Sequence, residues 1–598
     1  MPNYKAPVRD IRFLLHEVFD APREYAKCGF EDATEDMVDA ILGEGAKFAD
    51  NVIAPLNVGG DEHGSKWKDG KVTTAPGFKE AWAQFREGGW GSVGASPEFG
   101  GQGLPESVEL AINEMAHGAC LSWRMCAGLT LGAVHAIYAH ATDELKQQYL
   151  PKLISAEWTG TMCLTEPHAG SDVGIITTQA KPHDDGSFSI TGTKIFITYG
   201  EHDFTDNIVH LVLARLPGAP KGPKGISLFV VPKHLPKADG SLESGINGVL
   251  CATVEKKMGI KASPTCVLNF EDAKGWLVGP PNGGLACMFT MMNYARIDVA
   301  QQGLSQGERA LQGAAAYAVE RLQMRAANGP RNPEKAADPI IVHADIRRML
   351  LTMKSLVEGS RALSLFAALQ LDKKHSQDAA EQRKADDLLA FLIPITKGFL
   401  TEAGFEAAYW GMQSFGGHGY IHETGMEQYL RDARITSIYE GTNTIQANDL
   451  LRRKVLGTKG ALLSLFLHEV DALCHELSET PELAYQTEAL KSIRKEWEEL
   501  SQNLGQRTEA NADEAAGAAF DYLMYSGYAS LAYFWARMSK VASIKVQKGG
   551  ADAPFYKSKL QTARFYFERI LPRTRTLAVT LRAPSNTLME VADDGFTF

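Results

Sequence analysis

Apolar residues recur at three- and four-residue spacing from about Glu35 to Ile154, which predicts amphipathic helices interrupted by a Gly-rich stretch at 88–103. Near Thr159 the pattern changes to short alternating or β-branched runs separated by Gly- and Pro-containing turns. These runs cover residues 188–190, 195–198, 208–213, 226–231 and 267–270. Such a pattern is typical of a small antiparallel β domain.

Helical spacing resumes after the turn at 279–284, and a Pro-rich surface loop is expected at 328–340. The predicted helical stretches are 285–327, 341–374, 383–415, 444–456 and most of 461–598. We therefore expect a mostly α fold with a central antiparallel β domain and an additional C-terminal helical domain. The expected segments are 1–158 (helical, with an N-terminal arm), 159–278 (β), 279–460 (helical bundle) and 461–598 (additional helices).

Composition and charge argue against a nucleic-acid-binding, metal-binding or membrane-spanning protein. The net charge of -11 argues against a nucleic-acid backbone as partner. The eight cysteines have no metal-site spacing, so no metal is expected. The charge-free run 125–142 contains two histidines and two glycines, which favours a buried helix over a membrane span. The first residues lack an apolar signal stretch, and we expect a cytoplasmic protein.

Residues 89–94 match the pattern GxGxxG, which binds dinucleotides when it lies between a strand and a helix. A helical run precedes the match here, at 78–85, and a Pro- and Gly-containing segment follows it. We therefore expect no nicotinamide site at this position.

Two segments of the expected β domain carry candidate chemistry. In 162–172, hydroxyl groups and glycine lie at the edge of an apolar strand, where free backbone N–H groups suit a polar ring or a phosphate. In 194–200, Phe196 and Thr198 are two residues apart and face one side of a strand. A simple turn and ordinary strand packing are the alternatives.

Two further segments lie in the helical part. The glycine turn at 413–420 ends a helix, and its amides suit a pyrophosphate, although helix ends use glycine without any ligand. In 431–443, apolar residues lead to the single carboxylate Glu440, followed by Gly441, Thr442 and Asn443 as a helix start. A carboxylate near a helix N-terminus is favoured in any case, so this segment alone does not identify a catalytic base.

Together, and in this order, the four segments resemble the acyl-CoA dehydrogenase family over about residues 40–456. The sequences LTEPHAGSD at 164–172 and IYEGTN at 438–443 are the most specific matches. The N-terminal residues 5–10, the loop at 328–340 and the tail are similar to the large bacterial branch, which includes 3-methylmercaptopropionyl-CoA and long fatty-acyl-CoA dehydrogenases.

The resemblance implies an FAD-dependent oxidoreductase that converts a saturated acyl-CoA to the trans-2-enoyl-CoA, as in fatty-acid β-oxidation. Glu440 matches the base that removes the α proton, while the β hydrogen leaves as hydride to flavin N5. Because a free carboxylate with a pKa of about 4.3 is too weak a base for this proton, the site must desolvate it and stabilise the enolate-like charge. The matching FAD-contact positions are Met162, Leu164, Thr165, Gly170, Ser171, Phe196, Thr198, Arg321, Gln413, Gly416, Gly417, Thr442 and Thr444.

Some of these matches carry further implications. Arg321, Gln413, Gly416 and Gly417 match residues that reach the FAD of a neighbouring subunit, which implies a homo-oligomer, at least a dimer. The residues after Arg321 depart from the family pattern. The matching substrate contacts are Ser171, Arg296, Glu440, Gly441 and Arg452. Ala295 occupies the position where isovaleryl-CoA enzymes carry their base, so Glu440 stands alone as the candidate.

Alternative functions remain open at this point. Acyl-CoA oxidases also carry C-terminal helices, but their glycine turn usually contains a Cys that is absent from 414–417, which favours electron-transfer flavoprotein as the acceptor. Flavin-containing relatives that bind DNA use a basic C-terminal domain, whereas 461–598 holds 15 Lys and Arg against 18 Asp and Glu. The aromatic residues at 555–567 suit either peripheral membrane contact or packing, and packing is favoured. Acyl-chain length is not determined.

Overall fold

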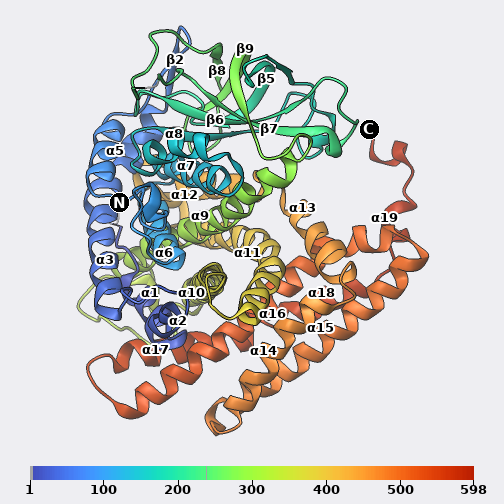
Figure 1. Cartoon of the computed structure of the whole chain (residues 1–598). Helices are drawn as coiled ribbons and strands as arrows, with labels where there is room; N and C mark the ends of the chain where they lie inside the picture. Colours follow the sequence, from blue (N-terminus) through green and yellow to red (C-terminus); the bar gives the residue numbers. More distant parts are fainter. Residues whose placement is uncertain (1–3, 238, 598) are drawn as a thin grey trace. The chain divides into compact units, whose positions relative to one another are not determined.

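The computed structural model describes residues 4–237 and 239–597, which form two compact units. One unit is Leu42–Asp298, and the other joins Met1–Ile41 to Val299–Phe598. Helix α9 (Gly284–Glu320) carries the chain from the first to the second (Figure 1). The first unit contains most of the two expected N-terminal segments, and the second contains the two helical segments that follow, together with the N-terminal arm.

A seven-stranded sheet forms the β part of the Leu42–Asp298 unit, with the strand order β3-β6-β4-β5-β9-β7 and β8 paired to β9. The strands are β3 (Thr159–Cys163), β4 (Gln179–Pro182), β5 (Phe188–Thr198), β6 (Ile208–Arg215), β7 (Ile226–Pro232), β8 (Val249–Val254) and β9 (Thr265–Val278). Because β7 pairs with both β9 and β6, the strand order returns on itself. Side chains on one face, among them Ile197, Val212, Phe229 and Leu268, form one buried core.

The expected antiparallel pairing holds for most neighbours in this sheet but not for all of them. β3 pairs with β6 in parallel over five residue pairs, and β4 meets β6 in parallel at Gln179 and Arg215. Parallel neighbours need a connection that returns to the same end of the sheet. The long segment between β3 and β6, which contains β4 and β5, provides that return.

Helices cover the other side of the strands in this unit, and α7 (Leu121–His140) packs against β3 (Figure 1). Most of α7 is buried, which confirms the expected buried helix in the charge-free run. The strands β1 (Lys66–Lys68) and β2 (Lys71–Thr73) form a hairpin that was not predicted, since its strands are only three residues long. The other helices are α3 (Glu35–Phe48), α4 (Leu56–His63), α5 (Phe78–Glu87), α6 (Glu106–Ala119) and α8 (Asp143–Ile154).

The other unit is helical in the residues that the structure describes. Its bundle helices are α9, α10 (Ala344–Lys373), α11 (Ala379–Ser414), α12 (Met426–Arg434) and α13 (Asn443–Asn448), and a π-helical segment follows at Asp449–Leu456. The C-terminal helices are α14 (Ala461–Leu477), α15 (Ala484–Ala510), α16 (Asp513–Lys548), α17 (Ala553–Phe565), α18 (Arg573–Arg582) and α19 (Asn586–Met589). The N-terminal arm holds α1 (Val8–Arg12) and α2 (Ala21–Lys27).

Helix α9 ends at Glu320, seven residues before the predicted end at 327. The next residues form a loop around the buried Asp338, whose carboxylate accepts hydrogen bonds from the backbone N–H groups of Ala326, Arg331 and Asn332. Backbone N–H groups that donate to this carboxylate cannot also form the i to i−4 hydrogen bonds of a helix. These bonds lower the pKa of Asp338 to about 2.

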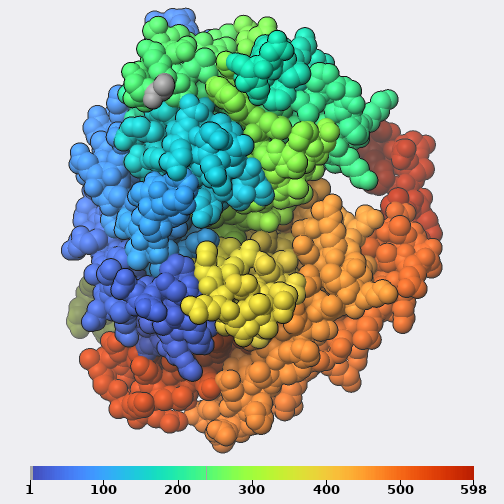
Figure 2. All heavy atoms as spheres, in the orientation of Figure 1, coloured from blue at the N-terminus to red at the C-terminus, as the bar shows by residue number. Residues whose placement is uncertain are grey.

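The C-terminal helices pack closely on the bundle, mainly through α16. A Cβ at Gly527 would lie 2.0 Å from the Phe399 ring on α11, and a Cβ at Gly398 would lie 2.5 Å from Leu523 on α16. Only glycine permits this approach. In the space-filling view part of the bundle (yellow) lies directly against the C-terminal helices (orange) (Figure 2), and α10 and α11 both contact α16.

The aromatic residues at 555–567 mostly pack onto protein. Tyr566 is fully buried, Tyr556 and Phe567 are nearly so, and Phe555 makes an edge contact with Phe13 of the N-terminal arm, with ring centroids 5.4 Å apart. This arrangement agrees with the favoured packing interpretation. By length and composition alone, α11 is a candidate membrane span, but 83% of its most apolar window is buried within the protein.

A buried ionic network ties the N-terminal arm to α10 and α17. Asp10 on α1 pairs with Arg361 at 2.5 Å and also with Lys559. Arg361 donates to Glu308 at 2.6 Å, and Lys559 forms an ion pair with Glu358 at 2.9 Å. Burial would raise the pKa of Asp10, but the two cations lower it to about 2. The network therefore connects four helices of this unit through charges that are almost fully removed from solvent.

Candidate functional site

The residues singled out in the sequence fall into two groups, one in each compact unit. Met162 to Thr198 and Arg296 belong to Leu42–Asp298. Arg321, the glycine turn, Glu440 and the residues after it belong to the other unit.

The first group is organised around the end of β3. Glu166 is 2% exposed and its carboxylate pairs with the ammonium of Lys194 at 2.8 Å. The backbone N–H and hydroxyl groups of Thr177 and Thr178 donate four more hydrogen bonds to it, at 2.6–3.1 Å. Burial alone would raise the pKa of Glu166, but Lys194 and these donors lower it to about 2. The carboxylate is therefore a structural anion and not a candidate base.

The same pair fixes the backbone beside it. Lys194 also donates to the carbonyl oxygen of Leu164 at 3.0 Å, and the Ile195 N–H donates to the carbonyl of Thr165 at 2.9 Å. The side chains of Met162 and Leu164 pack in the apolar core, so these two residues offer a ligand only their backbone. Thr165 is half-buried and lies two residues after the end of β3.

β5 is irregular where the aromatic candidate lies. The register with β9 shifts between Lys194 and Ile197, which is a β-bulge, and Phe196 inside it has φ 59°. Phe196 is 59% exposed, an unusual state for a large apolar ring. Ile197 and Tyr199 on either side of Thr198 are buried, so Phe196 and Thr198 share the less buried side as predicted.

Three hydroxyl groups of this region are available to a ligand. Among the described residues, the side-chain hydroxyls of Thr165, Ser171 and Thr198 form no hydrogen bond with the protein. The neighbouring hydroxyls of Thr177 and Thr178 are both bonded. Free hydroxyls and an exposed ring in the same unit fit a planar cofactor with polar edges, as a flavin has. Gly170 and Ser171 are exposed in the loop that follows β3.

Arg296 lies on α9 in the same unit and is 8% exposed. Its Nη1 donates to the Asn293 side chain at 3.5 Å, and its guanidinium lies 5.9 Å from the centre of the Phe289 ring. Ala295, next to it, is 6% exposed and brings no carboxylate to this position.

In the other unit the predicted glycine turn follows α11. Gln413, Gly416 and Gly417 are exposed, Gly416 has φ 60°, and no atom lies within 4 Å of where a Cβ of Gly416 or Gly417 would be. Phe415 stacks on Tyr317 of α9 with ring centroids 4.0 Å apart. This contact holds the turn beside the end of α9, where Arg321 follows directly. The open backbone suits the predicted pyrophosphate contact.

Glu440 lies between a 3₁₀ turn (Ile435–Ser437) and α13 in an unusual backbone conformation. It has φ 56° and Gly441 has φ 84°, so two consecutive residues are left-handed. For a residue other than glycine this conformation costs about 1–2 kcal/mol. Strain of this kind persists only where the surroundings enforce it, and it concentrates at functional sites. The Glu440 side chain is half-buried.

Buried polar groups hold this turn. The Lys397 ammonium on α11 donates to the carbonyl of Gly441 and to the Asn443 side chain, both at 2.9 Å. The Gln446 amide donates to the carbonyls of Glu440 at 3.3 Å and Gly441 at 3.4 Å. The Tyr439 hydroxyl bonds Gln302 on α9.

Lys397 was not among the predicted site residues. The available signal was a single lysine inside the apolar helical run at 388–400, because a lysine is rarely fully buried without a specific partner. Of the other predicted contacts, Thr442 caps α13 by accepting from the Ile445 N–H at 3.4 Å, and Thr444 and Arg452 are exposed.

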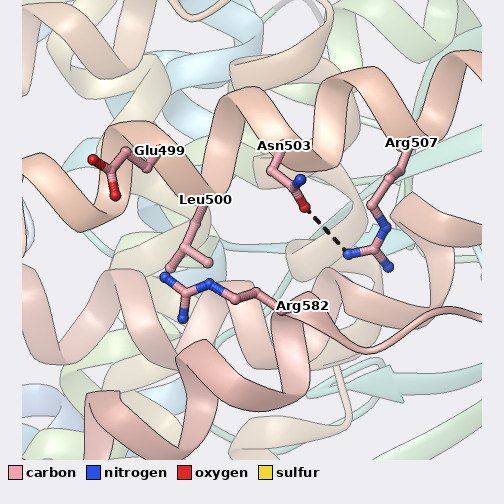
Figure 3. A pocket seen from close by; sticks show the side chains of 5 residues that line it. All are labelled: Glu499, Leu500, Asn503, Arg507 and Arg582. Atoms are coloured by element: carbon pink, nitrogen blue, oxygen red, sulfur yellow. Dashed lines mark hydrogen bonds between the residues drawn. The ribbon is translucent and has the colours of Figure 1, made fainter.

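A separate cavity of about 410 Å³ lies between α15 and α18. It is lined by Glu499, Leu500, Asn503, Arg507 and Arg582 (Figure 3). Both guanidinium groups already bond to protein acceptors, as Arg507 does to Asn503 and to the carbonyl of Leu581. None of the predicted site residues lines it. The described residues also contain no cluster of His, Cys, Asp and Glu that suits a metal.

Four family models match successive parts of the chain. The acyl-CoA dehydrogenase N-terminal, middle and C-terminal domain models match 38–157, 161–273 and 282–455, and an acetyl-CoA dehydrogenase C-terminal-like model matches 466–592. A 3-methylmercaptopropionyl-CoA dehydrogenase of Ruegeria pomeroyi is 41% identical over 95% of this chain and 96% of its own length.

Two further relatives extend this similarity. A broad-specificity linear acyl-CoA dehydrogenase of Mycobacterium tuberculosis is 33% identical over 100% of both chains. An acyl-CoA dehydrogenase of Bacillus anthracis, solved in complex with FAD, shares the fold with a TM-score of 0.74 and 21% identity over 94% of this chain and 91% of that one.

Proposed function

Because the chain belongs to the acyl-CoA dehydrogenase family, and is thus an FAD-dependent oxidoreductase acting on CH–CH bonds, we propose that Glu440 is its catalytic base. The observation that carries this proposal is the strained, half-buried Glu440 in a turn enforced by Lys397 and Gln446. Glu166 is unsuitable because its pKa is lowered to about 2, and Ala295 removes the alternative base position.

The residues divide the work between them. Glu440 takes the proton from the carbon α to the thioester carbonyl, and its partial burial removes water that would weaken it as a base. FAD, when bound, supplies the acceptor for the β hydrogen. Phe196, with its exposed ring, and the free hydroxyls of Thr165 and Thr198 would hold the flavin ring. Gln413 and the open amides of the glycine turn would hold a diphosphate, in the proposed oligomer that of a neighbouring subunit.

We further propose an unbranched acyl chain as substrate. Two similar relatives are named for 3-methylmercaptopropionyl-CoA and for linear acyl-CoA, and both acyl groups are unbranched. The test compares 3-methylmercaptopropionyl-, pentanoyl- and isovaleryl-CoA in a dye-reduction assay, because the three acyl groups have the same number of non-hydrogen atoms. We expect the two unbranched thioesters to have the higher kcat/KM. A preference for isovaleryl-CoA would contradict the proposal, and the ratio of the first two decides whether the thioether is recognised.

Electron-transfer flavoprotein is the proposed acceptor, and acyl-CoA oxidase is the competing activity. The absence of Cys from 414–417 supports the dehydrogenase. Stopped-flow reoxidation separates the two: the substrate-reduced enzyme should persist in aerated buffer and reoxidise quickly when electron-transfer flavoprotein is added. Rapid reoxidation by oxygen alone would identify an oxidase.

A further inference from the structure

We propose that Lys397 is a positioning residue that holds Glu440 in its reactive orientation. In this proposal α16 supports Lys397 by packing against the part of α11 that carries it. The inference rests on the proposed role of Glu440 as base. Lys397 lies on α11, 43 positions before Glu440 in the sequence, and is 0% exposed. Its ammonium is within hydrogen-bonding distance of the carbonyl of Gly441, the residue directly after the base.

The turn needs such a device because its backbone is strained. Glu440 and Gly441 both have positive φ, at 56° and 84°, and a glutamate relaxes to ordinary backbone angles when nothing prevents it. Lys397 donates to the carbonyl oxygen of Gly441, the second residue of this pair, and Gln446 donates to the carbonyls of both residues. Relaxation of this backbone would swing the Glu440 side chain, so these bonds decide where the carboxylate points.

The same lysine connects the turn to α13. Lys397 and Thr401 both donate to the side-chain oxygen of Asn443, the first residue of α13, at 2.9 and 3.3 Å. The Asn443 amide in return donates to the carbonyl of Gly398 at 3.1 Å and to Glu402 at 2.7 Å. The turn that carries the base is thereby connected to α11 and α13 through side chains on two successive turns of α11.

Helix α16 of the C-terminal domain presses on this part of α11. Leu523 lies against Gly398 and Gly527 lies against Phe399, the two residues that follow Lys397, and both contacts leave no room for a Cβ. α16 also packs against α13. The C-terminal domain therefore backs both helices that hold the base, and close packing transmits even small displacements.

The test compares Lys397→Met with the wild-type holoenzyme. We expect kcat to fall about 10- to 100-fold, because a shift of a catalytic group by about 1 Å can lower the rate up to about 100-fold. Three quantities should stay within threefold of the wild-type values. They are the KM for acyl-CoA, the dissociation constant of acyl-CoA measured from the flavin absorbance change on binding, and the FAD content. Lys397→Arg keeps a charged donor and should recover at least part of kcat.

Thr396→Val is the matched control, since Thr396 is equally buried on α11 and its hydroxyl bonds only the Leu392 carbonyl among described residues. It should leave kcat within twofold. An unchanged kcat in Lys397→Met, an equal loss in Thr396→Val, or a loss explained by missing FAD would overturn the proposal.

A double-mutant cycle with Gly441→Ala tests the connection directly. A Cβ at Gly441 would lie 2.8 Å from the Gln446 amide and would be strained at φ 84°, so this change disturbs the same turn without touching Lys397. We expect the two losses of kcat to be less than multiplicative. Independent losses would overturn the inference. If Lys397→Met is insoluble, Gly441→Ala carries the test, and wild-type kcat in that variant would refute the inference.

Glu440→Gln in the same assay separates the two proposals. Retained turnover in Glu440→Gln would overturn the assignment of the base and this inference with it. Loss of turnover in Glu440→Gln together with full activity in Lys397→Met would overturn the positioning role alone.

Discussion

Two fully buried lysines of this protein have different kinds of partner. At the end of β3, Lys194 pairs with a carboxylate, whereas Lys397 on α11 donates to a backbone carbonyl and to a side-chain amide oxygen at the start of α13. Lys194 and Lys397 are both 0% exposed, and both lie beside a strained residue, Phe196 or Glu440. Lys194 meets Glu166, but Lys397 meets Gly441 and Asn443.

The difference indicates two uses of a buried lysine. Removing Lys194 would leave the Glu166 charge inside the protein, so this pair stabilises the fold on which the flavin-side residues depend. Removing Lys397 would take a donor from the Gly441 carbonyl and the Asn443 side-chain oxygen, and it would free the turn that carries the base. The first lysine is expected to act mainly on stability and the second mainly on turnover.

Glu440→Gln should have the largest effect, because it removes the proposed base and keeps the shape of the side chain. We expect kcat to fall about 10²- to 10⁴-fold, the usual contribution of a general base. Dye reduction measures the turnover, and the FAD content and Tm should not change. Wild-type turnover would show that the strained turn serves another purpose.

Lys194→Met should be the most destabilising of the single changes, by about 3–5 kcal/mol, because it leaves a buried carboxylate without its cation. Lys397→Met should cost less, about 1–3 kcal/mol. Denaturant unfolding measures both. The double change Glu166→Leu with Lys194→Met should recover much of the loss. An equal loss of unfolding free energy in the two single variants would show that the two lysines stabilise the fold to the same extent.

Acid should weaken the flavin-side region, as it should the surroundings of Asp10 and Asp338, whose pKa values are also lowered to about 2. The folded-state pKa of Glu166 is lowered from 4.5 to about 2, so its stabilising contribution is present above pH 4.5 and is lost as the pH falls through about 2. The Tm of the wild type should therefore fall across this range. Glu166→Gln should be less stable at pH 6 and should show a flatter profile, while an unchanged slope would indicate that other carboxylates dominate.

Phe196→Gly should have the smallest effect on folding. The ring is 59% exposed, and relief of left-handed strain, about 1–2 kcal/mol, offsets the greater chain entropy of glycine. We expect the free energy of unfolding of the apoprotein to change by less than about 1 kcal/mol while the FAD dissociation constant rises. Isothermal titration with FAD measures the second quantity. A large loss of stability would mean that the ring has a role in packing.

The order of helices and strands followed from the sequence because period and turn residues are local properties. Strands β5, β6, β7 and β9 cover the expected runs, with 188–190 and 195–198 joined in β5, whereas β4 and β8 were not predicted. The buried helix in the charge-free run lies where it was expected, and the family is the one that four short segments indicated. The parallel pairing of β3 with β6 was not predicted, since pairing partners far apart along the chain leave no local pattern. The early end of α9 was not predicted either, because the bonds from Asp338 to the amides of Ala326, Arg331 and Asn332 form no periodic pattern in the sequence.

For the site, the sequence determined which residue types stand at Thr165, Phe196, Thr198 and Glu440, and hence which chemistry is available. Only the tertiary structure decided that Phe196 is exposed in a bulge and that Glu440 is left-handed. Both conformations are unfavourable for the residue itself, so no local preference predicts them. At Glu440 a buried group from a distant segment holds the turn, because Lys397 on α11 bonds the Gly441 carbonyl. At Phe196 the conformation accompanies the shift in the pairing of β5 with β9, which lies far along the chain.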